Sequence, residues 1–280
     1  MKNVLVTGVS SGIGKAVAQS FLNRNYRVFG SVRNEKDAER LQNEFGENFV
    51  PLLFDITDQQ AIDEAKKKLE THLDGAGLDC LVNNAGVSVN GPLAYIDLEQ
   101  VDFQMKVNVL GLLRVTQAFL PLLGFNSDHR PGRIVNISSA AGKSTRPFMA
   151  PYSASKHAVE ALSDGLRREL MDFGIEVIVI EPGPIQSEIW SKARETENVY
   201  RNTPYEKIYD NMNKAVDGME GVAIPAEKVG ELVVNAVEKK KPRTRYLIAP
   251  KKWLFWLAIN VFPDRFLDKM LHKQIQELNK

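Results

Sequence analysis

Short apolar runs rich in β-branched residues alternate with longer segments of helical periodicity along almost the whole chain. The pattern predicts strands over residues 4–7, 26–32, 49–54, 78–83, 133–138, 175–180 and 245–249. It predicts helices over residues 12–24, 35–45, 58–72, 98–123, 152–173 and 225–239. This alternation is typical of a parallel sheet covered on both faces and wound by right-handed crossovers. We therefore expect a single α/β domain with a Rossmann-type, doubly wound parallel sheet of about seven strands.

Two segments depart from this alternation. Residues 187–221 are polar and irregular, too few for a domain but suited to a lid over a substrate site. Residues 251–280 form an apolar helical extension beyond a catalytic domain of residues 1–250. Its most apolar stretch, residues 253–262, is too short to span a bilayer. We expect this extension to pack on its own domain or on a partner subunit, with contact to a membrane interface as the alternative.

Composition and charge narrow the functional classes. The 280 residues have a formal net charge of +1, are 44% hydrophobic and 25% charged, and so have the composition of an ordinary soluble globular protein. So small a net charge gives no support to nucleic-acid binding. The four histidines lack metal-ligand spacing, and we expect no metal site. The single cysteine, Cys80, lies in an apolar run, which predicts a buried thiol and favours a reducing, cytoplasmic location.

A glycine-rich turn joins the first predicted strand to the first predicted helix. Its sequence is Thr7-Gly8-Val9-Ser10-Ser11-Gly12-Ile13-Gly14. Glycines allow positive φ and a close approach to the backbone, and the N-terminus of the following helix attracts an anionic pyrophosphate. At this position in an α/β chain, the turn indicates a dinucleotide site.

The end of the second predicted strand bears on the choice of cofactor. Enzymes that prefer NAD usually place an acidic residue there to hold the ribose hydroxyls. In this chain the strand end carries Ser31 and is followed by Arg33, whose guanidinium suits a 2′-phosphate. Glu35 is the competing interpretation, since its carboxylate could serve NAD, but it lies beyond the strand. We therefore expect NADP(H) in preference to NAD(H).

A second group of polar residues carries the candidate chemistry. Tyr152 and Lys156 are four residues apart at the start of a predicted helix, so they share one face. A nearby ammonium favours the phenolate, so we expect Lys156 to lower the pKa of Tyr152 and to allow proton exchange near neutrality. Ser139, Asn108 and residues 83–86 fall at or beside strand ends, where ligands bind in such sheets.

Taken together and in this order, the motifs make the sequence similar to the classical branch of the short-chain dehydrogenase/reductase family over residues 2–190. The resemblance implies a catalytic group formed by Asn108, Ser139, Tyr152 and Lys156, all of which are present. It implies cofactor contacts from Gly8, Ser10, Ser11, Gly12, Ile13, Gly14, Arg33, Asp55, Ile56, Asn83, Ala85, Gly86, Tyr152, Lys156, Pro182, Gly183, Ile185 and Ser187. A serine stands at position 187, where the family more usually has threonine.

The resemblance also implies a role for each catalytic residue. Tyr152 acts as the general acid in reduction and as the general base in oxidation. Ser139, rather than its neighbour Ser138, hydrogen-bonds the substrate oxygen. Lys156 binds the nicotinamide ribose and lowers the pKa of Tyr152, while Asn108 holds a water molecule of a proton relay.

The substrate pocket is expected to combine Ser139 with the apolar side chains of Met149, Pro184 and Trp190. Apolar walls of this kind suit a bulky hydrophobic alcohol or ketone. The glycine turn, residues 31–33 and the apolar C-terminal segment also resemble the hydroxysteroid and retinol dehydrogenase-like members of the family. That resemblance implies a steroid, a retinoid or another bulky ketone or aldehyde as substrate, and a homodimer or homotetramer as the assembly.

The sequence therefore predicts an NADP(H)-dependent oxidoreductase that interconverts a carbonyl and an alcohol on a lipophilic substrate, with Tyr152 as acid/base. Two alternatives remain open. One is an NAD-dependent alcohol dehydrogenase that acts on a small or polar substrate. The other is a regulator that binds NADP(H) without turnover.

Overall fold

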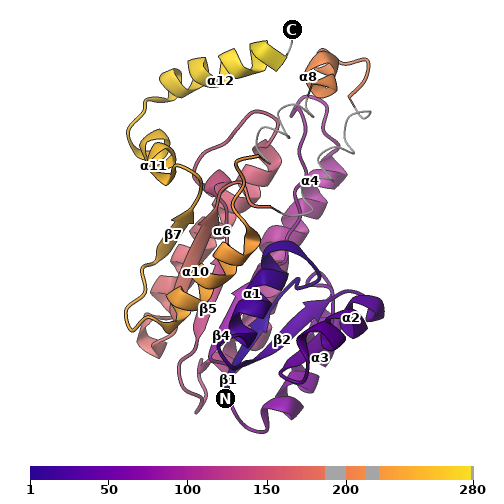
Figure 1. The fold of residues 1–280 in the computed structure, drawn as a ribbon, viewed down its shortest axis with the longest axis vertical. Helices are drawn as coiled ribbons and strands as arrows, with labels where there is room; N and C mark the ends of the chain where they lie inside the picture. The colour runs from indigo at the N-terminus through magenta and orange to yellow at the C-terminus, as the bar shows by residue number, and fades with distance from the viewer. Residues whose placement is uncertain (187–199, 212–220, 279–280) are drawn as a thin grey trace.

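The computed structural model describes residues 1–186, 200–211 and 221–278. Its centre is a seven-stranded sheet of order β3-β2-β1-β4-β5-β6-β7, in which every neighbouring pair is parallel (Figure 1). The strands are β1 (Lys2–Val6), β2 (Tyr26–Val32), β3 (Phe49–Leu53), β4 (Cys80–Asn83), β5 (Arg133–Ile137), β6 (Glu176–Pro182) and β7 (Arg245–Ile248). The predicted fold class, a doubly wound parallel sheet in one domain, is confirmed.

Helical segments connect the strands and continue beyond the last one. The α-helices are α1 (Gly12–Leu22), α2 (Glu35–Phe45), α3 (Gln59–Leu73), α4 (Leu98–Met105), α5 (Leu112–Phe119), α6 (Ala150–Glu169), α8 (Glu206–Asp210), α10 (Ala226–Glu238), α11 (Lys252–Asn260) and α12 (Asp264–Leu278). Shorter turns are the π-helix η1 (Lys106–Gly111) and the 3₁₀ segments η2 (Leu120–Leu123), η3 (Ala140–Gly142) and η4 (Met171–Phe173). Helix α6 begins two residues earlier than predicted because Pro151 fits the first turn of a helix, and it ends at Glu169.

The sheet separates two hydrophobic cores, and the alternation of side chains along each strand supplies both. Val4 and Val6 of β1 point into a core shared with α1, α2 and α10, whereas Leu5 points into a core shared with α3 and α5. All three side chains are fully buried, and each burial contributes roughly 1.5–3 kcal/mol. Helices α1 and α10 lie side by side on one face (Figure 1). They approach closely because Gly230 has no Cβ to collide with the backbone of α1.

The direction of winding reverses between β1 and β4, which pair side by side although they are far apart in sequence. The connections from β1 and β4 therefore leave to opposite sides of the sheet and open a crevice at the carboxyl ends of the strands. The glycine turn follows β1 and residues 83–86 follow β4, so both predicted cofactor motifs border this crevice.

The long helix predicted over residues 98–123 is continuous but not uniform. It runs as α4, η1, α5 and η2, with a π-helical turn at its centre. Leu98–Leu123 is long and apolar enough to cross a membrane, but about half of it is buried inside the protein, as in the core helix of a globular domain. Val115 and Phe119 pack into the core beneath the sheet.

A chain of buried amides and hydroxyls ties the central strands to the helices. Asn83 on β4 donates from Nδ2 to Thr116 Oγ1 and Asn136 Oδ1, both at 2.9 Å. Asn136 on β5 then donates to Ser163 Oγ of α6 at 2.9 Å. Buried polar groups are stable only when they are paired, so this network fixes the relative positions of β4, β5, α5 and α6. Cys80 is buried beside it, as predicted, and burial raises the pKa of its thiol.

The C-terminal extension is only partly buried. Within the described residues, neither α11 nor α12 has a fully buried side chain, and Trp253 and Trp256 are 60% and 56% exposed. Phe255, Leu257 and Ile259 of α11 are nevertheless partly buried. Packing of the tail on its own domain or on a partner subunit therefore stays a prediction.

Candidate active site

The turn between β1 and α1 has the backbone geometry that its glycines suggested. Gly8 and Gly12 adopt positive φ angles of 70° and 56°. A Cβ on Gly14 would collide with the carbonyl oxygen of Gly8, so only glycine allows the first turn of α1 to lie this close to the end of β1. The N-terminus of α1 therefore faces the crevice.

The same turn is tied to the end of β4. Thr7 Oγ1 accepts hydrogen bonds from the backbone N–H groups of Asn84 and Ala85 at 2.9 and 3.0 Å. Asn84 Nδ2 in turn donates to the carbonyl oxygens of Thr7 and Gly8 at 2.9 and 3.1 Å. These four bonds hold the two loops on either side of the crevice at a fixed separation.

The residues of this turn fit a pyrophosphate. Ser11 at the N-cap of α1 makes no side-chain capping bond to a described residue, and the first turn of the helix carries no acidic side chain. The N–H groups and the positive end of the helix dipole are therefore available to an anion. Ser10, Ile13 and Gly14 lie in the same turn.

The cofactor-selecting end of β2 is basic. Ser31 is buried, and its Oγ accepts the N–H of Gly8 at 2.9 Å, so the strand tip presents no acid. Arg33 follows on the surface. Arg40 of α2, which the sequence analysis missed, donates to the Ser10 carbonyl at 2.9 Å and brings a second guanidinium beside the turn. The exposed Glu35 lies in the first turn of α2.

Three further residues predicted to contact the cofactor, Asp55, Ile56 and Asn83, make contacts within the protein. Asp55 follows β3, where its Oδ1 accepts the Thr57 N–H and hydroxyl at 2.8 and 2.7 Å, which closes a local turn. The Asn83 side chain is committed to the internal network rather than to the crevice, and Ile56 is buried beneath Gly111.

Beyond β6, the predicted nicotinamide-facing segment is held by backbone bonds. Gly183 donates its N–H to the carbonyl of Ile248 at 2.8 Å, and Ile185 forms a parallel bridge with Ile224. Pro182 and Pro184 flank Gly183 at the carboxyl end of the sheet. Ser187 and Trp190 lie outside the described residues.

Ser139, Tyr152 and Lys156 come together at the carboxyl ends of β5 and β6. A side-chain hydrogen bond joins Tyr152 to Ser139. Ser139 Oγ also accepts the Ala141 N–H at 3.1 Å, which fixes its orientation. Lys156 lies one turn after Tyr152 on α6, with its Nζ 5.8 Å from the centre of the tyrosine ring. The adjacent Ser138 is buried and faces Gly142 instead.

The pKa values differ from the sequence-based expectation. Burial raises the pKa of Tyr152 above its ordinary value, although the hydrogen bond from Ser139 lowers it in part. Lys156 does not reverse this effect, because its Nζ donates to the carbonyl of Ile137 at 2.8 Å instead of to the phenol. Burial also lowers the pKa of Lys156 to about 8. The expected lowering of the pKa of Tyr152 is therefore wrong for this structure, because desolvation of the phenol has the largest effect on that pKa.

Asn108 lies in the π-helical turn η1, and its side chain is saturated by the protein. Its Oδ1 accepts the Val87 N–H at 2.8 Å, and its Nδ2 donates to the Val87 carbonyl and to Ser155 Oγ, both at 2.9 Å. These bonds join the loop after β4 to the helix that carries Tyr152. A π turn interrupts the regular backbone ladder and is frequent at functional sites. No pattern in the sequence predicted this π turn.

A buried carboxylate beside Lys156 was also missed. Glu160 lies one further turn along α6, and its Oε2 pairs with Lys143 Nζ at 3.0 Å and with Arg245 Nε at 2.9 Å. The negative charge of Glu160 raises the pKa of Lys156, against the larger lowering by burial. A Lys-x3-Glu pair is visible in the sequence, but its burial is not.

The same ion cluster links α6 to the last two strands. Arg245 on β7 also contacts Asp164 Oδ1 at 3.0 Å and Glu181 Oε1 at 3.6 Å. Burial, and secondly the charge of Glu160, raise the pKa of Glu181. The cluster therefore holds β6, β7 and the catalytic helix together directly behind Lys156.

A cluster of aromatic side chains lies before the start of α6 in the structure. Phe148 precedes Met149, the N-cap residue of α6, and its ring contacts those of Tyr205 and Tyr209 with centroids 5.5 and 5.8 Å apart. Tyr200 packs on Tyr209 at 4.6 Å. Met149, the next residue after Phe148, is half-buried, and its role as a pocket wall stays a prediction.

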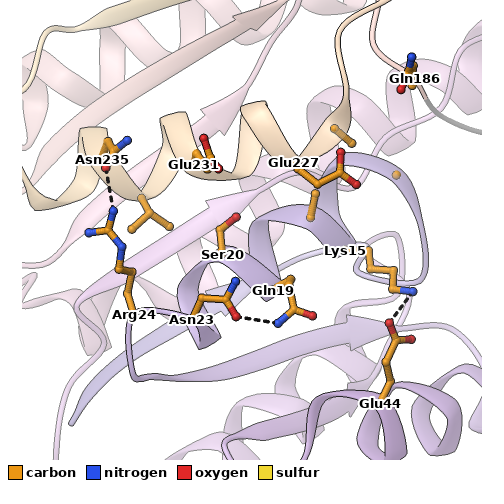
Figure 2. Close-up of a pocket in the computed structure, with 14 residues that line it drawn as sticks. Lys15, Gln19, Ser20, Asn23, Arg24, Glu44, Gln186, Glu227, Glu231 and Asn235 are labelled. Atoms are coloured by element: carbon orange, nitrogen blue, oxygen red, sulfur yellow. Dashed lines mark hydrogen bonds and ion pairs between the residues drawn. The ribbon is translucent and has the colours of Figure 1, made fainter.

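A separate groove of about 890 Å3 lies between α1 and α10 (Figure 2). Its rim is polar, with Lys15 paired to Glu44 at 2.8 Å and Arg24 bonded to Asn235 at 3.2 Å. The groove reaches Gly12 at the phosphate turn, but Ser139, Tyr152 and Lys156 do not line it. The catalytic chemistry therefore belongs to the crevice and not to this groove.

The fold and the crevice together define a class of protein. A doubly wound parallel sheet with a glycine turn at its reversal point, and a Ser–Tyr–Lys group at the ends of β5 and β6, defines a dinucleotide-binding oxidoreductase. In the described ranges, His, Cys, Asp and Glu side chains form no group of three or more that could hold a metal ion.

Comparison with known proteins agrees with this class. The family described as short chain dehydrogenase matches residues 2–198. The NADPH-dependent 3-dehydrocapnine reductase of Ornithobacterium rhinotracheale is 45% identical over 281 residues, covering 100% of this chain and 99% of the relative. Retinol dehydrogenase 16 of Mus musculus is 32% identical over 283 residues, covering 97% of this chain and 88% of the relative. Among solved structures, the closed form of serine dehydrogenase complexed with NADP+ matches with a TM-score of 0.76 at 25% identity. The match covers 89% of this chain and 95% of that chain.

The chain belongs to the short chain dehydrogenase family. It is an oxidoreductase, and the predictions of family and enzyme class are confirmed. The expectation of NADP(H) agrees with the cofactors in the names of these relatives.

We expect Glu160→Gln to move the alkaline limb of the kcat/KM profile for carbonyl reduction to lower pH. The reason is that Glu160 raises the pKa of Lys156, so its loss lets the ammonium deprotonate at lower pH. The measurement is kcat/KM against pH at saturating cofactor. Asp164→Asn is the matched control, since it removes another partner of Arg245 and should leave the profile in place. Identical profiles for wild type and Glu160→Gln would contradict the assignment.

Proposed function

We propose that the protein reduces the carbonyl group of a lipophilic substrate to an alcohol with NADPH. The observation that carries the proposal is the hydrogen-bonded pair of Ser139 and Tyr152, with Lys156 one turn away, beside a turn that fits a pyrophosphate. Bound NADPH would supply the hydride, which is chemistry that the protein itself lacks. The residues of the chain supply the proton and the orientation.

Each catalytic residue has a task that its position supports. Tyr152 donates its phenolic proton to the carbonyl oxygen as the alcohol forms. Ser139 hydrogen-bonds the same oxygen and holds it within reach of the phenol. Lys156, whose Nζ donates to the Ile137 carbonyl in this structure, would hold the nicotinamide ribose of a bound dinucleotide, and its ammonium would stabilise the phenolate. The π turn at Asn108 positions backbone groups that hold a relay water beside Lys156.

NADPH is preferred over NADH because of the groups at the end of β2. The strand tip presents Ser31 instead of a carboxylate, and Arg33 offers an exposed guanidinium to a 2′-phosphate. Arg40, which is paired with Asp37 at 2.7 Å, adds a second guanidinium beside the turn. The 45% identical relative, whose name states dependence on NADPH, supports this choice.

The substrate class rests on the apolar surroundings of the crevice and on the relatives. The rings of Phe148 and Tyr205 are in contact, and with Met149 and Pro184 they are the apolar wall that we propose for the substrate. The relatives include a 3-dehydrocapnine reductase and a retinol dehydrogenase. 3-Dehydrocapnine is therefore the first ketone to test. Residues 187–221, with Ser187 and Trp190, remain the proposed lid, and a homodimer or homotetramer the proposed assembly.

Tyr152→Phe removes the transferable proton and should lower kcat at least about a hundredfold, since general acid catalysis is worth roughly 10²–10⁴ in rate. The measurement is NADPH oxidation with 3-dehydrocapnine. NADPH binding, followed by tryptophan fluorescence, should persist. Tyr26→Phe, far from the crevice, is the control and should keep full activity. Full turnover by Tyr152→Phe would overturn the mechanism.

Arg33→Asp should weaken NADPH binding by about ten- to a hundredfold, because charge-assisted hydrogen bonds contribute roughly 1.5–3 kcal/mol. NADH binding should change far less, since NADH has no 2′-phosphate. Titration of both dinucleotides by tryptophan fluorescence measures the difference. Arg27→Asp makes the same charge change at the opposite end of β2 and should affect neither. Equal losses for both cofactors would remove Arg33 from the phosphate site.

We also propose that α11 brings the enzyme to an anionic membrane surface. Trp253, Leu254 and Trp256 expose apolar area at the protein surface, and Lys251 and Lys252 precede them with positive charge. Aromatic side chains flanked by basic residues are typical of interfacial helices. Such a location would keep a cytoplasmic enzyme close to a lipophilic substrate.

The double substitution Trp253→Ser and Trp256→Ser should abolish sedimentation with vesicles of anionic phospholipid. Wild type should bind these vesicles and release as salt screens the lysines. Met171→Ser, which removes an exposed apolar side chain from another segment, should bind as wild type does. Equal binding by the double variant would contradict membrane contact through α11.

A further inference from the structure

A cavity of about 400 Å3 lies between α12 and the loop that leads into the catalytic helix. One wall is formed by Pro147, Phe148 and Ala150, the last of which precedes Tyr152 by two residues. The opposite wall is formed by Leu271 and Ile275 of α12. Pro92, Leu93 and Tyr205 close the ends, and Thr145, Arg146, Asp268 and His272 also contribute to the lining. The cavity is thus mainly apolar, and its lining includes the first residue of the helix that carries Tyr152.

Helix α12 turns one side toward the domain. The side chains of Leu267, Leu271, Ile275 and Leu278 are partly buried, whereas the residues between them are exposed. Their spacing is that of one face of a helix. None of the four is fully buried, so the stripe lies over the domain without closing onto it. The C-terminal end is anchored where Asn211 Nδ2 donates to the Leu278 carbonyl at 3.0 Å.

The facing wall is built around an uncommon backbone conformation. Phe148 has a φ of +66°, a region that bulky side chains rarely adopt. Its carbonyl accepts the Gly91 N–H at 2.7 Å, which holds the strained turn. Strain of this kind persists where the surrounding structure fixes it, and it clusters at ligand sites. The result is that the Phe148 ring lies between the catalytic helix and α12.

We propose that this cavity binds the hydrocarbon chain of the substrate, with the ketone at Ser139 and Tyr152. The inference rests on the proposed reduction and extends it from a lipophilic ketone to a long-chain one. Ser139, Tyr152 and Lys156 do not line the cavity, so a small ketone that reaches them leaves it empty. An extended chain reaches both places at once. Helix α12 therefore sets the preferred chain length.

The test is the dependence of kcat/KM on chain length in a series of methyl ketones from butanone to tetradecanone. Burial of each additional methylene should raise kcat/KM about fourfold until the cavity is filled. Leu271→Asp should flatten this dependence and leave the rate for butanone unchanged. Met270→Asp is the matched control, because Met270 lies on the same helix but is exposed, and it should keep the dependence.

A second substitution separates the filling of the cavity from damage to the fold. Leu271→Trp occupies the space with an apolar side chain and should shorten the longest chain that still raises kcat/KM. An unchanged dependence in both Leu271 variants, or an equal loss in Met270→Asp, would overturn the proposal.

Direct binding distinguishes failure of this inference from failure of the proposed reduction. The fluorescent fatty acid cis-parinaric acid should bind wild type and Met270→Asp, and tetradecanone should displace it. Binding to Leu271→Asp should be lost. Chain binding without turnover of any ketone would contradict the reduction alone, whereas turnover with binding unaltered by Leu271→Asp would contradict the role of α12 alone.

Discussion

The hydrogen bonds from the N–H groups of Asn84 and Ala85 to the Thr7 hydroxyl hold together the two loops that border the crevice. They join the ends of β1 and β4, which lie side by side although they are far apart in the chain. The Asn84 amide completes the junction through the carbonyls of Thr7 and Gly8. The glycine turn is therefore rigid before any ligand arrives, and a rigid array of N–H groups binds an anion without reorganising.

The catalytic helix depends on a comparable set of buried contacts. Asn108 attaches the start of α6 to the loop after β4, and Glu160 attaches its middle to β7 through Arg245. Lys156 lies between these two anchors, where burial lowers the pKa of its ammonium and Glu160 raises it. The net result is a pKa of about 8 for Lys156, so a change in its surroundings can alter the charge beside Tyr152.

Much of the fold could be predicted because each local signal agreed with the next. The structure gives β2 and α2 the bounds that the sequence indicated, since β-branched residues, a strand end and the Asn34 N-cap follow in order. The order of the glycine turn, Ser139, Tyr152 and Lys156 indicated the family for the same reason. The π turn at Asn108 and the ion cluster at Glu160 could not be predicted from the sequence, because backbone distortion and burial depend on contacts between distant segments.

The sequence by itself determined the α/β class, the glycine turn and the candidate catalytic side chains, because periodicity, glycine and residue type are properties of the chain. The tertiary structure determined the burial, the hydrogen-bond partners and the pKa values of those side chains. It desolvated Tyr152, which raised the pKa that the sequence suggested would fall, and it placed Lys156 Nζ at the Ile137 carbonyl. It also left Trp253 exposed and placed Leu271 over a cavity. Desolvation and exposure are set by what packs around a residue, and that is fixed only when the whole chain has folded.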